Sequence, residues 1–361
     1  MQHLQHDSTS TSLTRTVREH TSTPSPGNSS VSAIGVMSLV DVEMTHFFST
    51  KTYKTISFRR EGQLLWRDVI FESSLTQPAL LQGILTTAML HKVTISDSPQ
   101  TKQKYTEPAL KKQGDALKSF IMILNEPSPS NCEALFCLSM LLTIWAFASR
   151  RLPPELNILY QSVFDQVPNA LDAQGSRWPS SIDDYVKIVG ISQGVYAVIK
   201  ETLDWLEDRP VSEFMRRCDT DTLPTVNADV DKALTELEDY LGGNQQASDP
   251  GSPGLSLEEL ELFGDQIQKL RLTFRFGQRP EWHDKVIGWP IMLPSPFAQA
   301  MKQRNPAALT ILAYWAACLY ALDDLWWIHG WPKALVIDIC SIVQGPWKQF
   351  LKWPRQVFRE T

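Results

Sequence analysis

Two apolar stretches decide the fold of this chain: NCEALFCLSMLLTIWAFAS at residues 131–149 and NPAALTILAYWAACLYAL at residues 305–322. Sixteen uncharged residues separate Glu133 from Arg150, and eighteen separate Arg304 from Asp323. A membrane-spanning helix needs roughly twenty predominantly apolar residues. Both stretches are shorter than that and contain polar side chains, so buried central helices of a large bundle fit better than membrane spans. The pair Asn305-Pro306 predicts a helix start, because a capping side chain precedes a proline at the first helical position.

Helical spacing of apolar residues continues through most of the remaining chain. Alternating β-branched runs between tight turns, which are typical of strands, are missing from the sequence. The sequence therefore predicts an all-α fold, with a single large multi-helix domain over residues 39–361. The predicted helices begin at Leu39 and then cover residues 76–95, 102–124, 131–149, 154–171, 181–206, 227–241, 256–276 and 306–322.

Two segments have a composition that does not favour packing. The first thirty residues contain thirteen Ser/Thr and four charged side chains, so we expect residues 1–38 to form a disordered tail or linker. They contain no apolar run typical of a signal peptide. Residues 242–254, GGNQQASDPGSPG, are expected to form a mobile loop. Ten acidic residues and one lysine occur over residues 229–265, which indicates a solvated face or, alternatively, a surface that recruits a partner.

Charge and cysteine content exclude several classes of protein. The chain has 34 Lys/Arg and 40 Asp/Glu, a net charge of −6, so it is not expected to bind nucleic acid by itself. Its five cysteines are too scattered for a disulfide framework and form no C-x-x-C pair for zinc. We therefore expect an intracellular protein without a bound metal or cofactor. The cysteines are Cys132, Cys137, Cys218, Cys318 and Cys340.

The sequence contains none of the common catalytic motifs. G-x-G-x-x-G, the P-loop, G-x-S-x-G and H-E-x-x-H are all missing. Asp323-Asp324 resembles the aspartate-rich magnesium motif of terpene cyclases, but the run DDLWW lacks the further carboxylate, so a polar turn at a helix end is the favoured interpretation. No catalytic residue is predicted. For an enzyme, Asp323, Asp324 and His329 would be the first residues to substitute.

Tryptophan is concentrated in the last quarter of the chain. Eight of the twelve tryptophans lie at or beyond residue 282. Tryptophan buries a large area while its indole N–H requires a partner, so such a cluster marks either a stiff core or the wall of a pocket. Spacing alone favours the core. The eight are Trp282, Trp289, Trp315, Trp326, Trp327, Trp331, Trp347 and Trp353.

Five motifs occur in a specific order. They are His-aromatic-aromatic-x-Thr at 46–50, a Trp-x-x-x-Ile turn at 66–70, a helix ending in Leu-His at 78–91, Pro-x-x-Leu-x-Ile-Leu-Ala-Tyr at 306–314, and Trp-Trp-x-x-Gly-Trp at 326–331. In this order the chain resembles the fungal-specific transcription factors of the sterol uptake control type, over roughly residues 39–355.

The resemblance implies an all-helical regulatory and ligand-binding domain. Members usually carry a six-cysteine binuclear zinc cluster that reads DNA, followed by a Ser/Thr-rich linker. Residues 1–131 contain no cysteine, so we expect a transcriptional regulator without its own DNA-binding module, nuclear and/or cytoplasmic. Pro332 also departs from the family pattern, and it is tolerated if it opens the next helix.

The resemblance further implies a hydrophobic pocket for an apolar ligand such as a sterol or terpenoid. We expect the ligand to enter between residues 131–149 and 306–322, with the Trp-rich C-terminal segment closing over it. The candidate wall residues are Phe136, Met140, Trp145, Tyr314, Trp315, Trp326 and Trp327.

Three alternatives stay open. In the first, the two apolar helices merely fill the core. In the second, the chain is a protein-interaction module that forms a homodimer or holds a DNA-binding partner. In the third, it is a helical-pocket enzyme, a cyclase or isomerase of a secondary-metabolite pathway.

Overall fold

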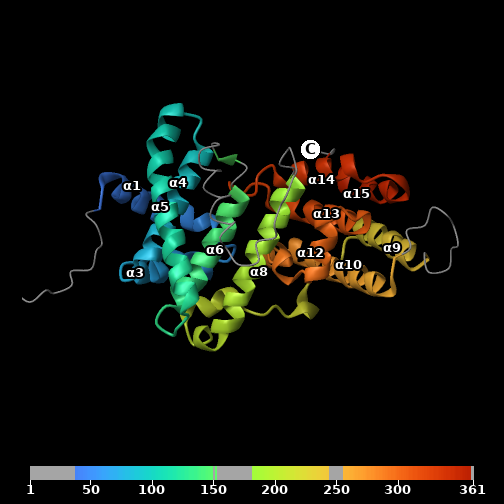
Figure 1. The fold of residues 1–361 in the computed structure, drawn as a ribbon, viewed down its shortest axis with the longest axis horizontal. Coiled ribbons are helices and arrows are strands. Elements are labelled where there is room, and N and C mark those ends of the chain that lie inside the picture. Colours follow the sequence, from blue (N-terminus) through green and yellow to red (C-terminus); the bar gives the residue numbers. More distant parts are fainter. Residues whose placement is uncertain (1–36, 149–150, 153–180, 244–254, 359–361) are drawn as a thin grey trace, which may run out of the picture. The chain divides into compact units, whose positions relative to one another are not determined.

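The computed structural model describes residues 37–148, 151–152, 181–243 and 255–358 (Figure 1). Within these ranges the chain forms α-helices and short 3-10 or π-helical segments and no strands. The predicted all-α fold is thereby confirmed. Residues 1–36 of the predicted tail, the predicted helix at 154–171 and residues 244–254 of the predicted loop lie outside the described residues.

The first half of the described chain packs around helices α4 and α6. Helix α4 lies against α1, α3, α5 and α6. Helix α8 (Ser181–Leu206) packs on α6 as well. The elements are α1 (Leu39–Thr50), η1 (Thr52–Thr55), α2 (Arg60–Leu64), η2 (Leu65–Val69), α3 (Ile70–Ser74), α4 (Pro78–Ile95), α5 (Pro99–Asn125) and α6 (Cys132–Ala148).

The second half packs around helix α13. Helices α10, α12 and α14 surround α13, while α8 contacts α6 on one side and α12, α14 and η7 on the other (Figure 1). The elements are α8 (Ser181–Leu206), η4 (Pro210–Met215), η5 (Thr220–Thr222), α9 (Ala228–Gly243), α10 (Leu257–Gly277), η6 (Pro280–Trp282), α11 (His283–Ile287), η7 (Trp289–Met292), α12 (Ser295–Lys302), α13 (Pro306–Leu319), η8 (Tyr320–Leu322), α14 (Trp331–Ile342), η9 (Gly345–Leu351) and α15 (Lys352–Gln356).

The two apolar stretches form central helices, as predicted. Every residue of α13 from Ala307 to Leu319 is buried, and all of α6 is buried except Glu133, Met140 and Thr143. Their neighbours differ, however: α6 packs on α4, α5 and α8, whereas α13 packs on α10 and α14. The two helices therefore belong to different helical groups.

Helix starts follow the capping chemistry of the sequence. Ser256 accepts a hydrogen bond from the Glu259 amide at 3.2 Å, and the Glu259 carboxylate accepts one from the Ser256 amide at 2.9 Å. Pro332 lies in the first turn of α14, which fits its position behind Trp331. The predicted turn at residues 66–70 is wrong: α2, η2 and α3 are consecutive helical segments with a π-helical stretch over Leu65–Val69, where one residue more per turn is accommodated without breaking the helix.

The cap of α13 gives a testable prediction. The Asn305 side-chain oxygen accepts hydrogen bonds from the amides of Ala307 at 2.9 Å and Ala308 at 3.4 Å. Asn305→Ala is expected to lower the free energy of unfolding by about 1 kcal/mol, because two first-turn amides lose their acceptor. Asn305→Asp supplies an equivalent acceptor and should stay close to wild type. Urea unfolding measures both, and equal losses in the two variants would contradict the capping role.

Three motif segments meet at one place, which we call the Trp326 junction: Phe47, Thr52, Thr55, His91, Trp326 and Trp327. The His91 ring stacks on Trp326 with 4.8 Å between centroids, and Thr52 bonds the His91 Nδ1 at 3.0 Å. The indole N–H groups of Trp326 and Trp327 donate to the hydroxyl and the carbonyl oxygen of Thr55, each at 2.9 Å. The junction therefore ties the loop before α14 to η1 and α4.

No single helix in the described ranges combines the length and apolarity needed to cross a bilayer. By length and composition alone, one bent pair could, Ser295–Lys302 with Pro306–Leu322, which meet at 102°.

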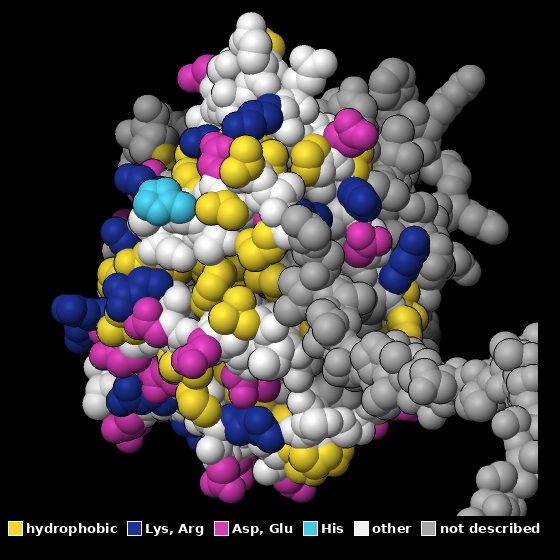
Figure 2. Space-filling view, turned by 90° about the vertical axis from the view of Figure 1, so that its left-hand side faces the viewer, with side chains coloured by type: hydrophobic (Ala, Val, Ile, Leu, Met, Phe, Trp, Pro, Cys, Tyr) yellow, Lys and Arg dark blue, Asp and Glu magenta, His cyan; other side chains and the backbone are white. Residues whose placement is uncertain are grey.

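Figure 2 looks onto the side that carries α1, α3 and α5. Hydrophobic side chains gather in the middle of its described part, with lysine, arginine and acidic side chains around them. Exposed apolar residues on α1 and α5 are Leu39, Val42 and Met122, and Val69 and Leu75 flank α3 on either side. The homodimer that the sequence leaves open stays a prediction.

Candidate ligand-binding site

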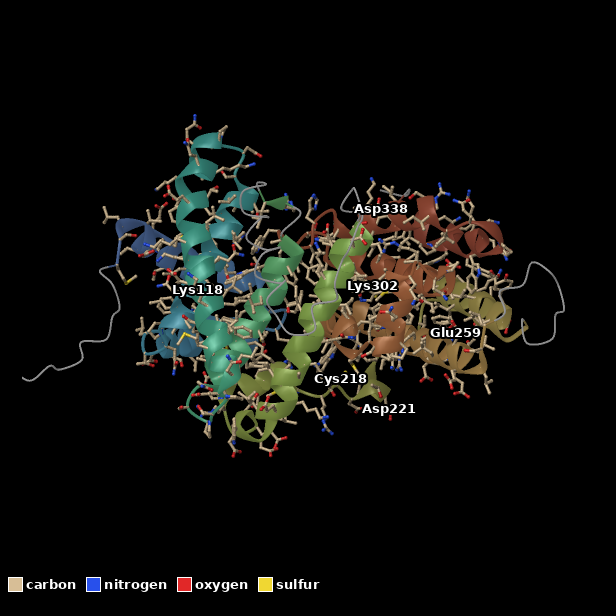
Figure 3. All side chains as sticks on the ribbon, in the orientation of Figure 1. Lys118, Cys218, Asp221, Glu259, Lys302 and Asp338 are labelled. Carbon is tan, nitrogen blue, oxygen red and sulfur yellow. The ribbon has the colours of Figure 1, made fainter. Side chains whose placement is uncertain are left out.

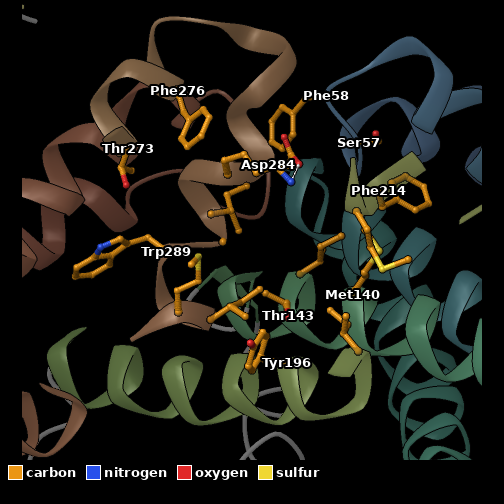
Figure 4. A pocket seen from close by; sticks show the side chains of 18 of the residues that line it. Ser57, Phe58, Met140, Thr143, Tyr196, Phe214, Thr273, Phe276, Asp284 and Trp289 are labelled. Carbon is orange, nitrogen blue, oxygen red and sulfur yellow. Dashed lines mark ion pairs between the residues drawn. The ribbon is translucent and has the colours of Figure 1, made fainter. Parts of the chain in front are cut away.

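A cavity of about 500 Å³ lies where α6, α8, α10 and the segment from α11 to η7 come together (Figure 4). Its volume falls within the range of roughly 300–1,000 Å³ that is typical of small-molecule sites. The lining residues are Ile56, Ser57, Phe58 and Arg59; Phe136, Met140, Thr143 and Ile144 of α6; Tyr196 and Ile199 of α8; Phe214 and Met215 of η4; Lys269, Leu272, Thr273 and Phe276 of α10; Asp284, Lys285, Ile287, Gly288, Trp289, Ile291 and Met292; and Trp327.

The cavity explains why two residues of α6 are not fully buried. Met140 and Thr143 are among the few residues of this helix that are not fully buried, and both line the cavity. The third, Glu133, lies at the start of the helix and pairs with Arg209 at 3.6 Å. The less covered side of α6 is therefore the side that faces the cavity.

Two hydroxyl groups on the wall are satisfied within the protein, whereas the buried Trp289 Nε1 and Asp284 Oδ1 have no hydrogen-bond partner among the described residues. The Thr143 hydroxyl donates to the Ser139 carbonyl at 3.2 Å, and the Thr273 hydroxyl donates to the Lys269 carbonyl at 2.8 Å. These threonines use their hydroxyls within their own helices. The cavity is therefore lined by apolar side chains for the most part, with charged groups at a few points.

Three of the seven predicted wall residues line this cavity. Phe136 and Met140 contribute from α6, and Trp327 contributes from the loop before α14. The expected entry between residues 131–149 and 306–322 differs from the structure, because none of the lining residues belongs to α13. The reason is that α6 and α13 pack against different neighbouring helices, so α13 contributes no residue to this cavity.

The other four predicted residues satisfy their polar atoms elsewhere. Trp145 donates to the Thr87 hydroxyl at 2.8 Å, on the side of α6 that faces α4. Tyr314 donates to the Phe350 carbonyl at 3.0 Å and stacks on Trp353. Trp326 belongs to the Trp326 junction.

Trp315 lies one layer behind the cavity wall. Its indole N–H donates to the Val286 carbonyl at 2.9 Å, and its ring stacks on that of Trp289 with 5.5 Å between centroids and 22° between planes. Trp289 itself lines the cavity. Trp315 therefore supports the wall through Trp289.

The residues singled out for an enzymatic alternative form a turn. Asp323 Oδ1 accepts from the Gly330 amide at 2.8 Å, and His329 Nδ1 lies 3.2 Å from Asp323 Oδ2. Gly330 has φ of +82°, which glycine adopts readily. Asp324 is exposed, and none of these residues is among those that line the cavity.

Other reactive groups in the described ranges give no candidate centre. Their histidine, cysteine and acidic side chains form no group of three that could hold a metal ion. Burial raises the pKa of the Cys137 and Cys318 thiols well above the ordinary value, so neither is a thiolate at neutral pH.

Sequence reasoning missed most of the wall on α8, η4, α10 and η7. The one usable signal was Trp289, which belongs to the tryptophan cluster that indicates either a core or a pocket wall. Ile199, Phe214 and Phe276 have ordinary helical or loop spacing, and only their tertiary placement brings them to the cavity.

Comparison with known proteins gives a distant similarity. Over 332 residues the chain is 19% identical to a protein of Gibberella zeae described as a Zn(2)-C6 fungal-type transcription factor. The chain is similar to a fungal transcription factor over most of its length. The match covers 88% of this chain and 62% of the relative, so the chain spans less than two thirds of the relative's length. No family model matches the chain.

Proposed function

We propose that this chain is a fungal transcriptional regulator whose helical domain binds an apolar small molecule, such as a sterol or terpenoid, in the cavity between α6, α8, α10 and η7. The observation that carries the proposal is this largely apolar cavity of about 500 Å³ in a chain that is similar to a transcription factor. In this proposal the protein acts in the nucleus, and DNA is contacted by a DNA-binding partner.

The place of the cavity suggests how occupancy would be transmitted. Its walls come from α6, in the first helical group, and from α10 and η7, in the second. A ligand that contacts both helical groups stabilises the arrangement of the groups that fits it better. The ligand shifts the equilibrium between two such arrangements only by the difference in its affinity for them. Burial of apolar ligand surface contributes about 25 cal/mol per Å². A ligand of this size can therefore bias a two-state domain.

We further propose that the ligand is bound and released unchanged. Supporting this, the acidic and histidine residues considered for catalysis lie in the 323–330 turn and are not among the lining residues. Mass spectrometry of the ligand after prolonged incubation with the protein tests this point, and a new product that depends on the protein would contradict it.

A cavity-filling variant tests ligand binding directly. Met140→Trp places a larger side chain into the cavity and should abolish the increase in melting temperature that a saturating apolar ligand gives to the wild type. A ligand at 100 times its Kd stabilises the folded state by about 2.7 kcal/mol, which corresponds to several degrees. Ergosterol and a panel of terpenoids serve as probes in a thermal-shift assay.

Met122→Trp is the matched control, because Met122 is 71% exposed on α5. It should keep the full ligand-induced shift. Circular dichroism of both variants shows whether they fold. If no apolar compound raises the melting temperature, or if Met140→Trp leaves the shift intact, the proposed function is wrong.

A further inference from the structure

Four charged residues are among those that line the apolar cavity. Arg59, Lys269 and Lys285 provide three positive charges, and Asp284 provides one negative charge. The chain as a whole has a net charge of −6, so an excess of positive charge here is opposite to the overall balance. The pairing of each group decides whether this excess is available to a ligand.

Two of the three cations already have carboxylate partners. Arg59 Nη1 lies 3.1 Å from Glu213 Oε1, its other terminal nitrogen donates to the Glu213 carbonyl, and its guanidinium lies over the Trp282 ring at 5.3 Å. Lys285 Nζ lies 3.3 Å from Asp284 Oδ2. These pairs account for both Arg59 and Lys285.

Lys269 is the cation that remains. Within the described part of the chain, its ammonium group makes no ion pair and no side-chain hydrogen bond. It is half-buried on α10, on the same face as Leu272, Thr273 and Phe276, which also line the cavity. A half-buried ammonium group without a counter-ion loses part of its hydration and gains no ion pair in return.

A second unpaired donor lines the same cavity. The indole N–H of Trp289 is buried and has no hydrogen-bond acceptor in the described part of the protein. Trp289 lines the cavity together with Thr273, which is one helical turn after Lys269 on α10. Leaving a buried donor unpaired is unfavourable, and an acceptor that reaches this wall offsets the cost.

We propose that the ligand of this cavity is an amphipathic acid: an apolar body held among residues such as Phe136, Met140 and Ile199, with an anionic carboxylate end bound by Lys269. This inference rests on the proposed function, since it names the ligand class of the same cavity. Charge-assisted hydrogen bonds between an ammonium group and a carboxylate are roughly twice as strong as neutral ones. An acid is therefore bound more tightly than a neutral ligand with the same body.

Matched pairs of ligands test the proposal. Hexadecanoic acid and the diterpenoid abietic acid are each compared with their methyl esters, which keep the apolar body and remove the charge. Titration of the full chain by intrinsic tryptophan fluorescence, below the critical micelle concentration, gives the Kd values. We expect the better-binding acid to bind about tenfold more tightly than its ester.

Variants at Lys269 assign the preference to this residue. Lys269→Met should remove the acid-over-ester preference, whereas Lys269→Arg should keep it. Lys118→Met is the matched control, since Lys118 is exposed on α5, far from α10 in Figure 3. An ester that binds as tightly as its acid, or a preference that persists in Lys269→Met, would overturn the proposal.

The two proposals fail in different ways. If the esters or ergosterol bind in a manner that Met140→Trp abolishes, and the acids show no preference, only the acid end group is wrong. If acids, esters and ergosterol all fail to bind, the proposed function fails with it.

Discussion

Replacement of Trp315 by alanine is expected to lower the free energy of unfolding by about 3–5 kcal/mol, the range for truncating a large buried aromatic side chain. The Trp315 side chain is fully buried in α13, and its ring lies against Tyr185 at 4.9 Å and Trp289 at 5.5 Å. Alanine leaves a cavity and removes the indole donor from the Val286 carbonyl. Urea unfolding followed by circular dichroism measures the loss.

The same substitution should also weaken ligand binding, because Trp289 loses the ring that supports it. Trp315→Phe separates the two contributions: it keeps much of the aromatic contact, removes the hydrogen bond and should cost about 1–3 kcal/mol. Met122→Ala, at an exposed position of α5, should stay within about 0.5 kcal/mol of wild type. If Trp315→Ala destabilises the protein no more than Met122→Ala does, the structural role given to Trp315 is wrong.

Much of the fold was predictable because it depends on local patterns. The uncharged runs around Cys137 and Ile311 are too apolar to lie at a surface, so both had to be central helices. Capping side chains at Ser256 and Asn305 set helix starts within a residue or two. These features depend on neighbours in sequence, which a single chain displays directly.

The site was less predictable because it depends on which helices are neighbours in space. An apolar helix is buried on every side, and its sequence does not say which side faces a cavity. On α6, Met140 faces the cavity while Trp145 packs toward α4. Lys269 was equally hard to predict. In the sequence it is an ordinary lysine of an amphipathic helix, and it stands out only because the other cations on the cavity wall have carboxylate partners.

The order of the motifs was visible in the sequence, but their contact was not. Thr52 and Thr55 follow the first motif, His91 ends the third, and Trp326 opens the last. The structure brings them together although 271 positions separate Thr55 from Trp326. These long-range contacts give the motif residues a physical role. The Thr55 hydroxyl accepts a hydrogen bond from the Trp326 indole N–H, and the neutral His91 ring stacks on the Trp326 indole.

Acidification should destabilise the protein through His91, whose burial, together with the nearby Lys92, lowers its pKa from 6.5 to about 4. The unfolded chain takes up this proton near pH 6.5, and the folded protein does so only near pH 4. Between these values the unfolded state binds more protons, so stability is fully present above about pH 6.5 and is lost as the pH falls toward 4. A difference of this size corresponds to about 3 kcal/mol at 1.36 kcal/mol per pKa unit.

The free energy of unfolding, measured by urea denaturation from pH 7.5 to pH 4, checks this expectation. Other groups add to the loss of stability at the acidic end of this range, including the carboxyl groups of Asp41 and Glu43, whose pKa values are lowered in the folded protein. The informative quantity is therefore the difference between wild type and His91→Gln, in which the ring is removed and these carboxyl groups remain. His91→Gln is expected to be less stable at pH 7.5, because the stack on Trp326 is lost, and to lose less stability on acidification. Exposed His46→Gln should follow the wild-type curve, and a His91→Gln curve parallel to wild type would show that His91 does not titrate in this way.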